Sequence, residues 1–309
     1  MENQITIREA RTETDVAAFW EQLYEYFRRD VLPDPEDEDR AYFFGEEYRS
    51  QVQQLHARPQ DRLYYLFFCR DGRDIGFSMA SIYTSEDGKC FVEEFCVLPE
   101  FRGSGTGRAC AKVLLRWAEA HGAHYAELNY GSDPRRLRFW QSIGFQKNGA
   151  DEWGDPLLLL PPQETLPFTV EVLSDPEDWQ LKKLENGYLQ EIGEEVLTEE
   201  KQKRLSDAIR EGKITFFLAK RGYRAVEMCS VVRCFSTFAC ADNAVLEDFY
   251  VEPIFRKQGI ARQLAETARR RCVEWGIASL TVCCAPCDEK MYQSLGFTVP
   301  LGRAFACLP

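Results

Sequence analysis

The chain has 309 residues, 45% of them hydrophobic and 28% charged, and 50 acidic against 38 basic residues leave a net charge of −12. A chain of this length is expected to form about two domains, and it has no apolar run near the roughly 18 residues of a membrane helix. Since no stretch gathers the Lys/Arg stripe that phosphate backbones require, we expect neither a membrane nor a nucleic acid as partner. The N-terminal segment lacks the apolar stretch of a secretory signal, so we expect a cytoplasmic protein.

The first half begins with an early helix, which a set of antiparallel strands follows. Asp71-Gly72 is a turn signal between the first two β-rich runs, and Pro99 ends the run over 90–97, which we interpret as a fourth strand. A helical stretch follows with Gly122 at its C-terminal stop. The predicted elements are a helix over residues 12–29, strands over 63–69, 75–83 and 90–97, a helix over 105–121, a strand over 125–130 and a short helix before Gly144-Phe145.

The second half repeats this order. Residues 92–108 recur as residues 246–262, shifted by 154, with eight of the 17 positions identical. A second repeated segment relates residues 140–145 to residues 292–297, with a shift of 152. We therefore predict two domains of one fold, residues 1–162 and 163–309, joined at Pro161-Pro162-Gln163. The elements predicted in the second half are helices over 176–192 and 259–275, strands over 214–220, 225–235, 246–251 and 279–284, and a short helix before Gly296-Phe297.

In each copy a loop with glycines leads from a strand into a helix. The N-terminus of a helix has unpaired amides and a partial positive charge, and glycines let the backbone curl around an anion. Gly105 and Gly107 in the first copy, and Gly259 with the small Ala261 in the second, suit a pyrophosphate. A tight turn feeding a helix is the ordinary interpretation of one such loop, but two copies in the same setting favour an anion site.

These loops resemble the acetyl-CoA loop of the GNAT superfamily of acyltransferases. The matching motifs are Arg102-x-x-Gly105-x-Gly107 and Arg256-x-x-Gly259-x-Ala261, each behind Val-x-Pro and ahead of a helix. Tyr292-x-x-x-Gly296-Phe297, and its counterpart with Trp140, is similar to the last segment of the same family, so the resemblance covers both halves.

The resemblance implies an α/β (α+β) fold with two tandem GNAT-like acyl-CoA N-acyltransferase domains, each a mixed, mostly antiparallel sheet flanked by helices. In such a domain the fourth and fifth strands splay apart, and the pantetheine arm of the cofactor lies in the gap. The two-domain arrangement is also similar to that of mycothiol synthase.

The resemblance also implies acetyl-CoA (coenzyme A) as the cofactor of both loops, where the arginines add positive charge at the rim. The implied binding residues of the first copy are Cys96, Val97, Arg102, Gly103, Ser104, Gly105, Thr106, Gly107 and Arg108. Those of the second copy are Tyr250, Val251, Arg256, Lys257, Gln258, Gly259, Ile260, Ala261 and Arg262.

Acyl transfer from a thioester to an amine needs a base for the amine proton and an acid for the departing thiolate. Glu93 and Glu247 are identical between the copies and lie in the fourth strand, so we predict them as the bases. Glu94 and Asp248 follow directly, but strand neighbours face opposite sides, so at most one of each pair should reach a given cleft. The alternative role of these carboxylates is a surface pair with an arginine.

Tyr292 stands where GNAT members often place the acid that protonates the thiolate. The alternative is an aromatic core residue, since Trp140 occupies the equivalent position of the first copy. Trp has no hydroxyl, so the first domain is active, regulatory or purely supportive, and we expect the second domain to be the catalyst.

The sequence thus predicts an N-acetyltransferase that moves an acetyl group from acetyl-CoA to a primary amine of a small molecule or peptide by direct attack. Two alternatives stay open: an acyl-CoA-binding scaffold or sensor with one or both domains inactive, and a tandem transferase that uses charged tRNA, against which the acidic charge counts. The acceptor pockets are expected from residues 30–58 and 191–213, while the acceptor and the oligomeric state stay unknown. Cys284-x-x-Cys287 has no second ligand pair at zinc spacing, so we expect no metal site and reduced thiols.

Overall fold

The computed structural model describes residues 4–131, 133–161, 166–237 and 239–302. It divides into two compact units, one of residues 1–147 with 156–164 and one of residues 148–155 with 165–309, which we call the first and the second domain. The short segment Asn148–Asp155 thus groups with the second domain. The expected boundary between residues 162 and 163 lies outside the described residues and stays a prediction.

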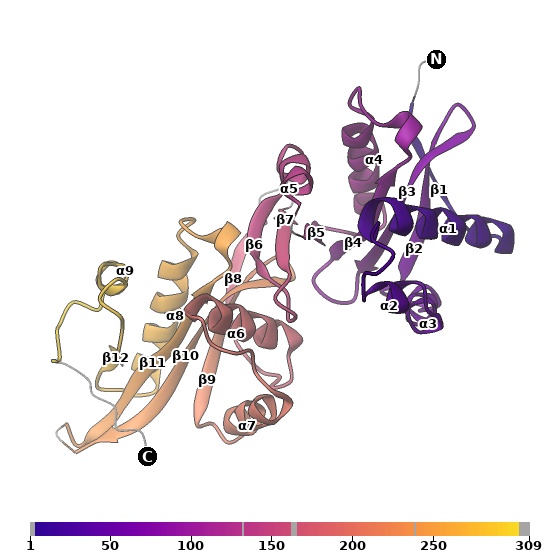
Figure 1. The fold of residues 1–309 in the computed structure, drawn as a ribbon. Helices are drawn as coiled ribbons and strands as arrows, with labels where there is room; N and C mark the ends of the chain where they lie inside the picture. The colour runs from indigo at the N-terminus through magenta and orange to yellow at the C-terminus, as the bar shows by residue number, and fades with distance from the viewer. Residues whose placement is uncertain (1–3, 132, 162–165, 238, 303–309) are drawn as a thin grey trace. The chain divides into compact units, whose positions relative to one another are not determined.

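The sheet of the first domain has seven strands in the order β1-β2-β3-β4-β5-β7-β6, although the last three residues of β6 group with the second domain (Figure 1). β4 and β5 run parallel, whereas the β1–β2, β2–β3, β3–β4 and β5–β7 pairs are antiparallel, so the sheet is mixed and mostly antiparallel. The strands are β1 (Thr6–Glu9), β2 (Leu63–Arg70), β3 (Arg73–Tyr83), β4 (Lys89–Val97), β5 (Tyr125–Asn129), β6 (Gln146–Ala150) and β7 (Pro156–Leu160).

Helices cover both faces of this sheet, because apolar side chains alternate along its strands. On β2, Leu66 and Phe68 pack in the core that contains α4, while Tyr65 and Phe67 pack in the core that contains α1. The helices are α1 (Glu13–Tyr26), α2 (Arg40–Phe43), α3 (Glu46–His56), α4 (Thr106–Ala120) and α5 (Pro134–Gln141), with a π-helical turn η1 (Phe27–Val31) and a 3-10 turn η2 (Pro99–Phe101). The helix expected over residues 12–29 is therefore interrupted, since its α-helical part ends at Tyr26 and π-helical geometry follows.

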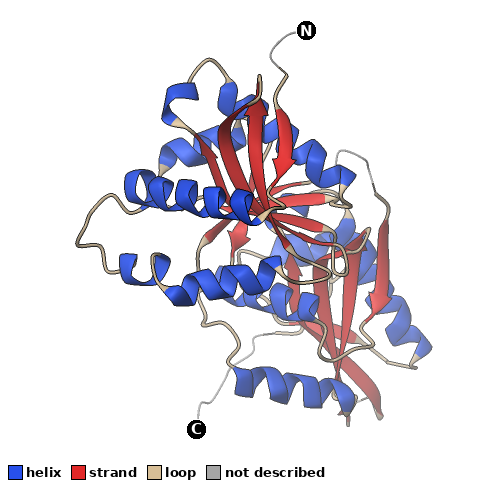
Figure 2. Ribbon diagram, turned by 90° about the vertical axis from the view of Figure 1, so that its right-hand side faces the viewer, coloured by secondary structure: helices blue, strands red, loops and turns tan. Residues whose placement is uncertain are grey.

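The second domain has a five-stranded sheet in the order β12-β11-β10-β9-β8, again with helices beside it (Figure 2). Its strands are β8 (Phe168–Val172), β9 (Ile214–Arg221), β10 (Arg224–Ser236), β11 (Ala241–Val251) and β12 (Leu280–Val282). Its helices are α6 (Trp179–Ile192), α7 (Glu199–Arg210), α8 (Ile260–Glu274) and α9 (Glu289–Ser294), with a 3-10 turn η3 (Pro253–Phe255). The strand expected over residues 279–284 is shorter than predicted, with three residues.

The parallel strands of each sheet separate soon after they pair. β4 and β5 are in register only at Lys89–Phe91 with Tyr125–Glu127, and β11 and β12 only at Ala244–Leu246 with Leu280–Val282. The remaining residues of β4 and β11 run on toward the glycine loops without a partner on that edge in the described chain. This geometry confirms the expected fold class in both domains. No helix among the described residues is long and apolar enough to cross a membrane.

Candidate active site

Both glycine loops adopt backbone conformations that require glycine at the helix start. Gly105 and Gly259 precede α4 and α8 with φ of +81° and +83°, a region that side chains with a Cβ rarely adopt. A Cβ built on either glycine would meet no atom within 4 Å. The space over both loops is therefore open, and an anion can approach the backbone closely.

The first loop leaves amides that can bind such an anion. Among the first four amides of α4, Thr106 donates to the Gly103 carbonyl at 3.0 Å and Ala109 donates to the Gly105 carbonyl at 3.0 Å. The amides of Gly107 and Arg108 have no partner in the described chain. With the positive end of the helix dipole behind them, they form a suitable diphosphate site.

The motif arginines are already paired with protein groups. Arg102 donates to the Val97 carbonyl at 2.8 Å and forms an ion pair with Asp30 of η1. Arg256 repeats this arrangement, with its Nε donating to the Val251 carbonyl at 2.9 Å and its Nη2 paired with Glu191. Each arginine thus ties the end of its strand to the early helical segment, rather than standing as a free cation at the rim.

The other residues predicted for the cofactor fall into two groups. One group is exposed and surrounds the loops: Gly103, Ser104, Arg108, Lys257, Gln258 and Arg262. The other group is buried or half-buried beneath them: Cys96, Val97, Thr106, Gly107, Tyr250, Val251, Ile260 and Ala261. The Tyr250 ring packs on α6 so closely that a Cβ on Gly187 would lie 2.8 Å from its hydroxyl, which makes this side chain part of the core.

A β-bulge in β4 places the two predicted carboxylates of the first domain side by side. The β3–β4 register shifts between Met79 and Ala80, which pair with Glu94 and Val92 and leave Glu93 as the extra residue. Val92 and Phe95, three residues apart, accordingly pack in the same core on the α4 side. The expected alternation therefore fails here, and Glu93 and Glu94 are both half-buried.

Burial raises the pKa of both carboxyls into the neutral range. The pKa of Glu93 rises to about 7, although a hydrogen bond from Ser81 at 3.3 Å and the charge of Lys89 oppose the shift. The pKa of Glu94 rises to about 8 because of burial and the neighbouring Glu93 charge, against a hydrogen bond with Tyr26 of α1. A carboxylate with such a pKa is well suited to accept a proton near pH 7.

The second domain has the same bulge but a different exposure of its carboxylates. The β10–β11 register shifts between Cys229, opposite Phe249, and Val231, opposite Leu246. Glu247 is exposed, whereas Asp248 is half-buried and accepts a hydrogen bond from Ser230 at 2.9 Å. Burial raises the pKa of Asp248, and the Ser230 hydrogen bond opposes the shift.

Two side chains of α6 lie near Asp248. Glu185 is only 6% exposed, and its Oε1 has no hydrogen-bond partner in the described chain. Burial, and then the Asp248 charge, raise the pKa of Glu185 to about 8. The pKa of Tyr188 is raised by burial and then by the same Asp248 charge. The interior of this site is therefore acidic, with a phenol beside the carboxylates.

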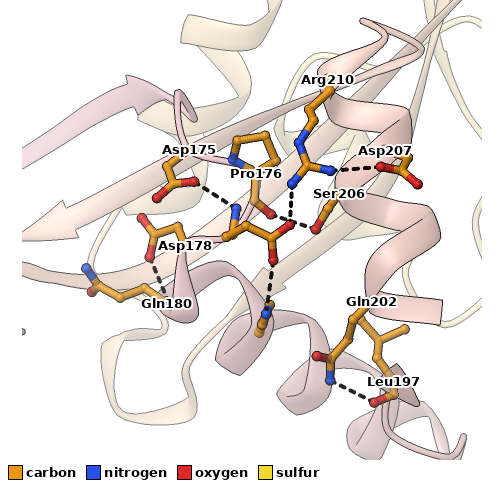
Figure 3. A network of polar contacts seen from close by, with 11 residues as sticks. Asp175, Pro176, Asp178, Gln180, Leu197, Gln202, Ser206, Asp207 and Arg210 are labelled. Carbon is orange, nitrogen blue, oxygen red and sulfur yellow. Dashed lines mark hydrogen bonds and ion pairs between the residues drawn. The ribbon is translucent and has the colours of Figure 1, made fainter. Parts of the chain in front are cut away.

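The start of α6 is fixed by a polar network with α7 (Figure 3). Arg210 pairs with Glu177 at 2.5 Å, and Ser206 donates to the Pro176 carbonyl at 3.0 Å. Asp178 caps α6 by accepting from the Gln180 amide at 2.8 Å. These contacts hold the helix that carries Glu185 and Tyr188 in a defined position.

The aromatic residues at the equivalent positions of α5 and α9 are both buried. Trp140 packs edge-on against Phe95 and Phe145, with ring centroids 5.1 Å away in each case. Tyr292 is 9% exposed and packs against Phe249 and Phe297, at 6.1 and 6.0 Å. Burial raises the pKa of Tyr292, and the charges of Tyr188, Asp288, Cys284 and Asp248 add to the shift. Its phenol therefore stays protonated at neutral pH.

Sequence reasoning missed Tyr26, Tyr188 and Glu185, which the early helices bring to the carboxylates. Tyr26 and Tyr188 are separated by 162 residues, not by the 152 or 154 of the recognisable repeat, because the segments after the early helices differ in length. The only signal in the sequence is a tyrosine near the end of each early helix, on the face that also carries its buried apolar residues.

The cysteines of the described part of the chain are not arranged to bind a metal ion. Its eleven cysteines are all free thiols, including the exposed Cys283, Cys284 and Cys287. No group of three or more His, Cys, Asp or Glu side chains among the described residues is arranged to hold a metal ion.

A protein-family model matches both domains. The family model described as "Acetyltransferase (GNAT) family" matches residues 20–145 and again residues 178–297. Similar solved structures include a probable acetyltransferase, with 22% identity and a TM-score of 0.42 over 46% of this chain and 97% of the other. An aminoglycoside N-acetyltransferase in complex with CoA has 16% identity and a TM-score of 0.40 over 47% and 97%. Glucosamine-6-phosphate N-acetyltransferase from Arabidopsis thaliana has 16% identity and a TM-score of 0.38 over 46% and 99%. No curated protein matches the chain.

Proposed function

The chain belongs to the acetyltransferase (GNAT) family, and on that premise we propose that it transfers an acetyl group from acetyl-CoA to a primary amine of a small molecule or peptide. It is an acetyltransferase of the GNAT type with two matching domains. The free thiols of the described chain agree with a reducing compartment, and we place the activity in the cytoplasm.

The residues of the glycine loops fit the diphosphate of coenzyme A. The unpaired amides of Gly107 and Arg108 would hold it in the first domain, and the open backbone at Gly259 would do so in the second. The unpaired edges of β4 and β11 leave room for an extended arm to reach the carboxylates. Bound acetyl-CoA supplies the thioester that is attacked.

The reaction needs one proton removed from the amine and one returned to sulfur. The amine nitrogen attacks the thioester carbonyl, the C–S bond breaks, and an amide and coenzyme A are the products. In the second domain Asp248 accepts the amine proton and the Tyr292 phenol donates a proton to the thiolate. The raised pKa of Tyr292 keeps this phenol in the protonated form that the step requires.

One observation supports this proposal most: in each domain a carboxyl group at the β-bulge lies close to a tyrosine of the early helix. The pairs are Glu94 with Tyr26 in the first domain and Asp248 with Tyr188 in the second. We therefore propose Asp248 rather than the exposed Glu247 as the base of the second domain. In the first domain Glu93 and Glu94 share this role. The carboxyl groups at both sites, in their ionised form, favour an amine as the acceptor, and the amine attacks in its neutral form.

The test is release of free coenzyme A from acetyl-CoA across a panel of primary amines, with the full chain. We expect release with at least one amine, and a loss of about 10²–10⁴-fold in the double variant Glu94→Gln, Asp248→Asn. Acetyl-CoA binding by calorimetry should persist in that variant. Matched controls are the exposed carboxylates Glu13→Gln, which lies outside the expected acceptor pockets, and Asp242→Asn, on the same strand as Asp248.

Tight acetyl-CoA binding without coenzyme A release in the wild-type chain would contradict the enzymatic proposal and indicate a binding scaffold. Unchanged release in the double variant would contradict the assignment of the bases.

A further inference from the structure

A hollow of about 300 Å³ lies beside the glycine loop of the first domain. Ser104, Gly105 and Thr106 form its loop side, and the flank of α4 forms another. Ile5, just before β1, and Arg70, at the end of β2, close it on the far side. The hollow therefore lies over the β1–β2 side of α4, away from the gap between β4 and β5.

Three cationic side chains line this hollow: Arg70, Lys112 and Arg116. Lys112 and Arg116 are one turn apart on the same exposed face of α4. Arg70 lies over the Phe101 ring at 5.6 Å. None of the three forms an ion pair with another described residue. In a chain with a net charge of −12, such a group of cations without ion-pair partners gives the hollow a positive potential that can attract an anion.

The geometry of α4 brings these cations toward the loop. Lys112 lies six residues after Thr106, which is a rise of about 9 Å along the helix. Side chains of an α-helix lean toward its N-terminus, so the long Lys112 and Arg116 side chains extend back toward Ser104 and Thr106.

The second domain does not repeat this charge. The residue 154 positions after Lys112 is Glu266, while Arg270 corresponds to Arg116. Arg221, at the end of β9 as Arg70 is at the end of β2, donates to Gln258 at 3.0 Å and lies over the Phe168 ring at 5.1 Å. The equivalent surface therefore has a carboxylate and an engaged arginine where the first domain has unpaired cations.

We propose that this hollow binds the 3′-phosphate of the coenzyme A ribose in the first domain only. The inference rests on the proposed function, which places the diphosphate of the same cofactor on the adjoining amides of Gly107 and Arg108. A phosphate monoester is close to dianionic at neutral pH, and Lys and Arg bind it through charge-assisted hydrogen bonds. The continuity of the hollow with residues 104–106 of the loop favours a phosphate on the bound nucleotide over a free anion.

The test compares coenzyme A with 3′-dephospho-coenzyme A on the full chain by hydrogen–deuterium exchange with mass spectrometry. Peptides that cover residues 103–116 and 257–270 report the two loops separately. At the first loop we expect half-maximal protection at about tenfold lower concentration of coenzyme A than of the dephospho form. At the second loop the two ligands should differ by less than about twofold.

In the double variant Lys112→Gln, Arg116→Gln the preference of the first loop for coenzyme A should disappear, while its curve for the dephospho form stays unchanged. That unchanged curve also shows that the variant is folded. Arg270→Gln is the matched control on α8 and should leave the first loop unaffected.

Equal protection of the wild-type first loop by both ligands would overturn the inference and leave the proposed function intact. Equal protection by inorganic phosphate alone at the same concentration would assign a free-anion site and also overturn it. If neither nucleotide protects either loop, the cofactor assignment of the proposed function fails as well.

Discussion

The two domains share a backbone and differ in the side chains at their sites. Both have a glycine in the left-handed region before the helix, an arginine folded back on the preceding strand, and a bulge at the predicted carboxylates. Yet Glu93 and Glu94 are both half-buried, while Glu247 is exposed and only Asp248 turns toward the interior. The backbone features that suit cofactor binding are thus the same in both domains, and the groups that we propose for proton transfer differ.

The two domains also differ in which of the proposed proton-transfer groups, the base and the acid, they contain. The first domain has two carboxyls with a pKa near neutrality but a tryptophan in place of the phenol. The second domain has the phenol of Tyr292 with one bulge carboxylate, Asp248. Since only the second domain combines base and acid, we expect it to carry most of the turnover.

Removal of the proposed base of the second domain should have the largest effect on the activity. We expect Asp248→Asn to lower kcat by about 10²-fold or more, because no other bulge carboxylate of that domain faces the interior. Glu94→Gln should remove only the smaller part of the activity, since Glu93 stays in place. Steady-state kinetics with the best amine of the panel check both.

Glu247→Gln is the matched comparison for Asp248→Asn. A large loss of kcat in Glu247→Gln with little change in Asp248→Asn would reverse the assignment of the base. A larger loss in Glu94→Gln than in Asp248→Asn would instead identify the first domain as the main catalyst.

Loss of the phenol should have the next largest effect. Tyr292→Phe keeps the ring contacts with Phe249 and Phe297 but removes the proton donor. We expect kcat to fall by about tenfold to hundredfold while the Kd for acetyl-CoA changes by less than about twofold. Stopped-flow kinetics and calorimetry on the same preparation measure the two quantities, and an unchanged kcat would remove the acid role.

The pH dependence should distinguish the bases of the two domains. Glu94, with a pKa of about 8, accepts a proton only when it is ionised. In an Asp248→Asn background the remaining kcat/KM should therefore rise with pH up to about 8 and fall about tenfold per unit below about 7. A profile that is flat between pH 6 and 9 would exclude Glu93 and Glu94 as the base.

The sequence predicted the fold through its repeat, and it failed where geometry depends on tertiary contacts. The loops, β4 and β11 followed from residues 92–108 and 246–262, whose spacing is preserved. The short edge strands β1 and β8 were missed, since four or five residues with alternating exposure carry little pattern.

The same limit applies to the site. The alternation of side chains along a strand predicted that at most one carboxylate of each neighbouring pair faces the cleft. The β-bulge breaks this alternation, and its only sign in the sequence is that the apolar residues Val92 and Phe95 are three positions apart. Tyr26 and Glu185 come from helices that no local motif connects to the strand, so only the packed structure relates them to the carboxylates.

The smallest expected effect is a change in the stability of the second domain, and it concerns Glu227, a position where the two domains differ. Glu227 pairs with Val251 as Gly76 pairs with Val97, so the two residues are equivalent in the ladder. At Gly76 a Cβ would lie 2.3 Å from the Cys96 carbonyl oxygen, which excludes any side chain there. Glu227, by contrast, is fully buried, and neither carboxyl oxygen has a hydrogen-bond partner in the described chain.

Burial raises the pKa of Glu227 from an ordinary value of 4.5 to about 8. Between these values the folded chain holds a proton that the unfolded chain releases, so the stability of the second domain should fall as pH rises from about 5 to about 8. Glu227→Gln cannot ionise, and we expect it to raise the melting temperature at pH 8.5 by a few degrees, about 1–3 kcal/mol, with little change at pH 5. Calorimetric unfolding at both pH values measures this, and a pH dependence of equal slope in the variant and the wild type would show that Glu227 does not change its protonation on unfolding.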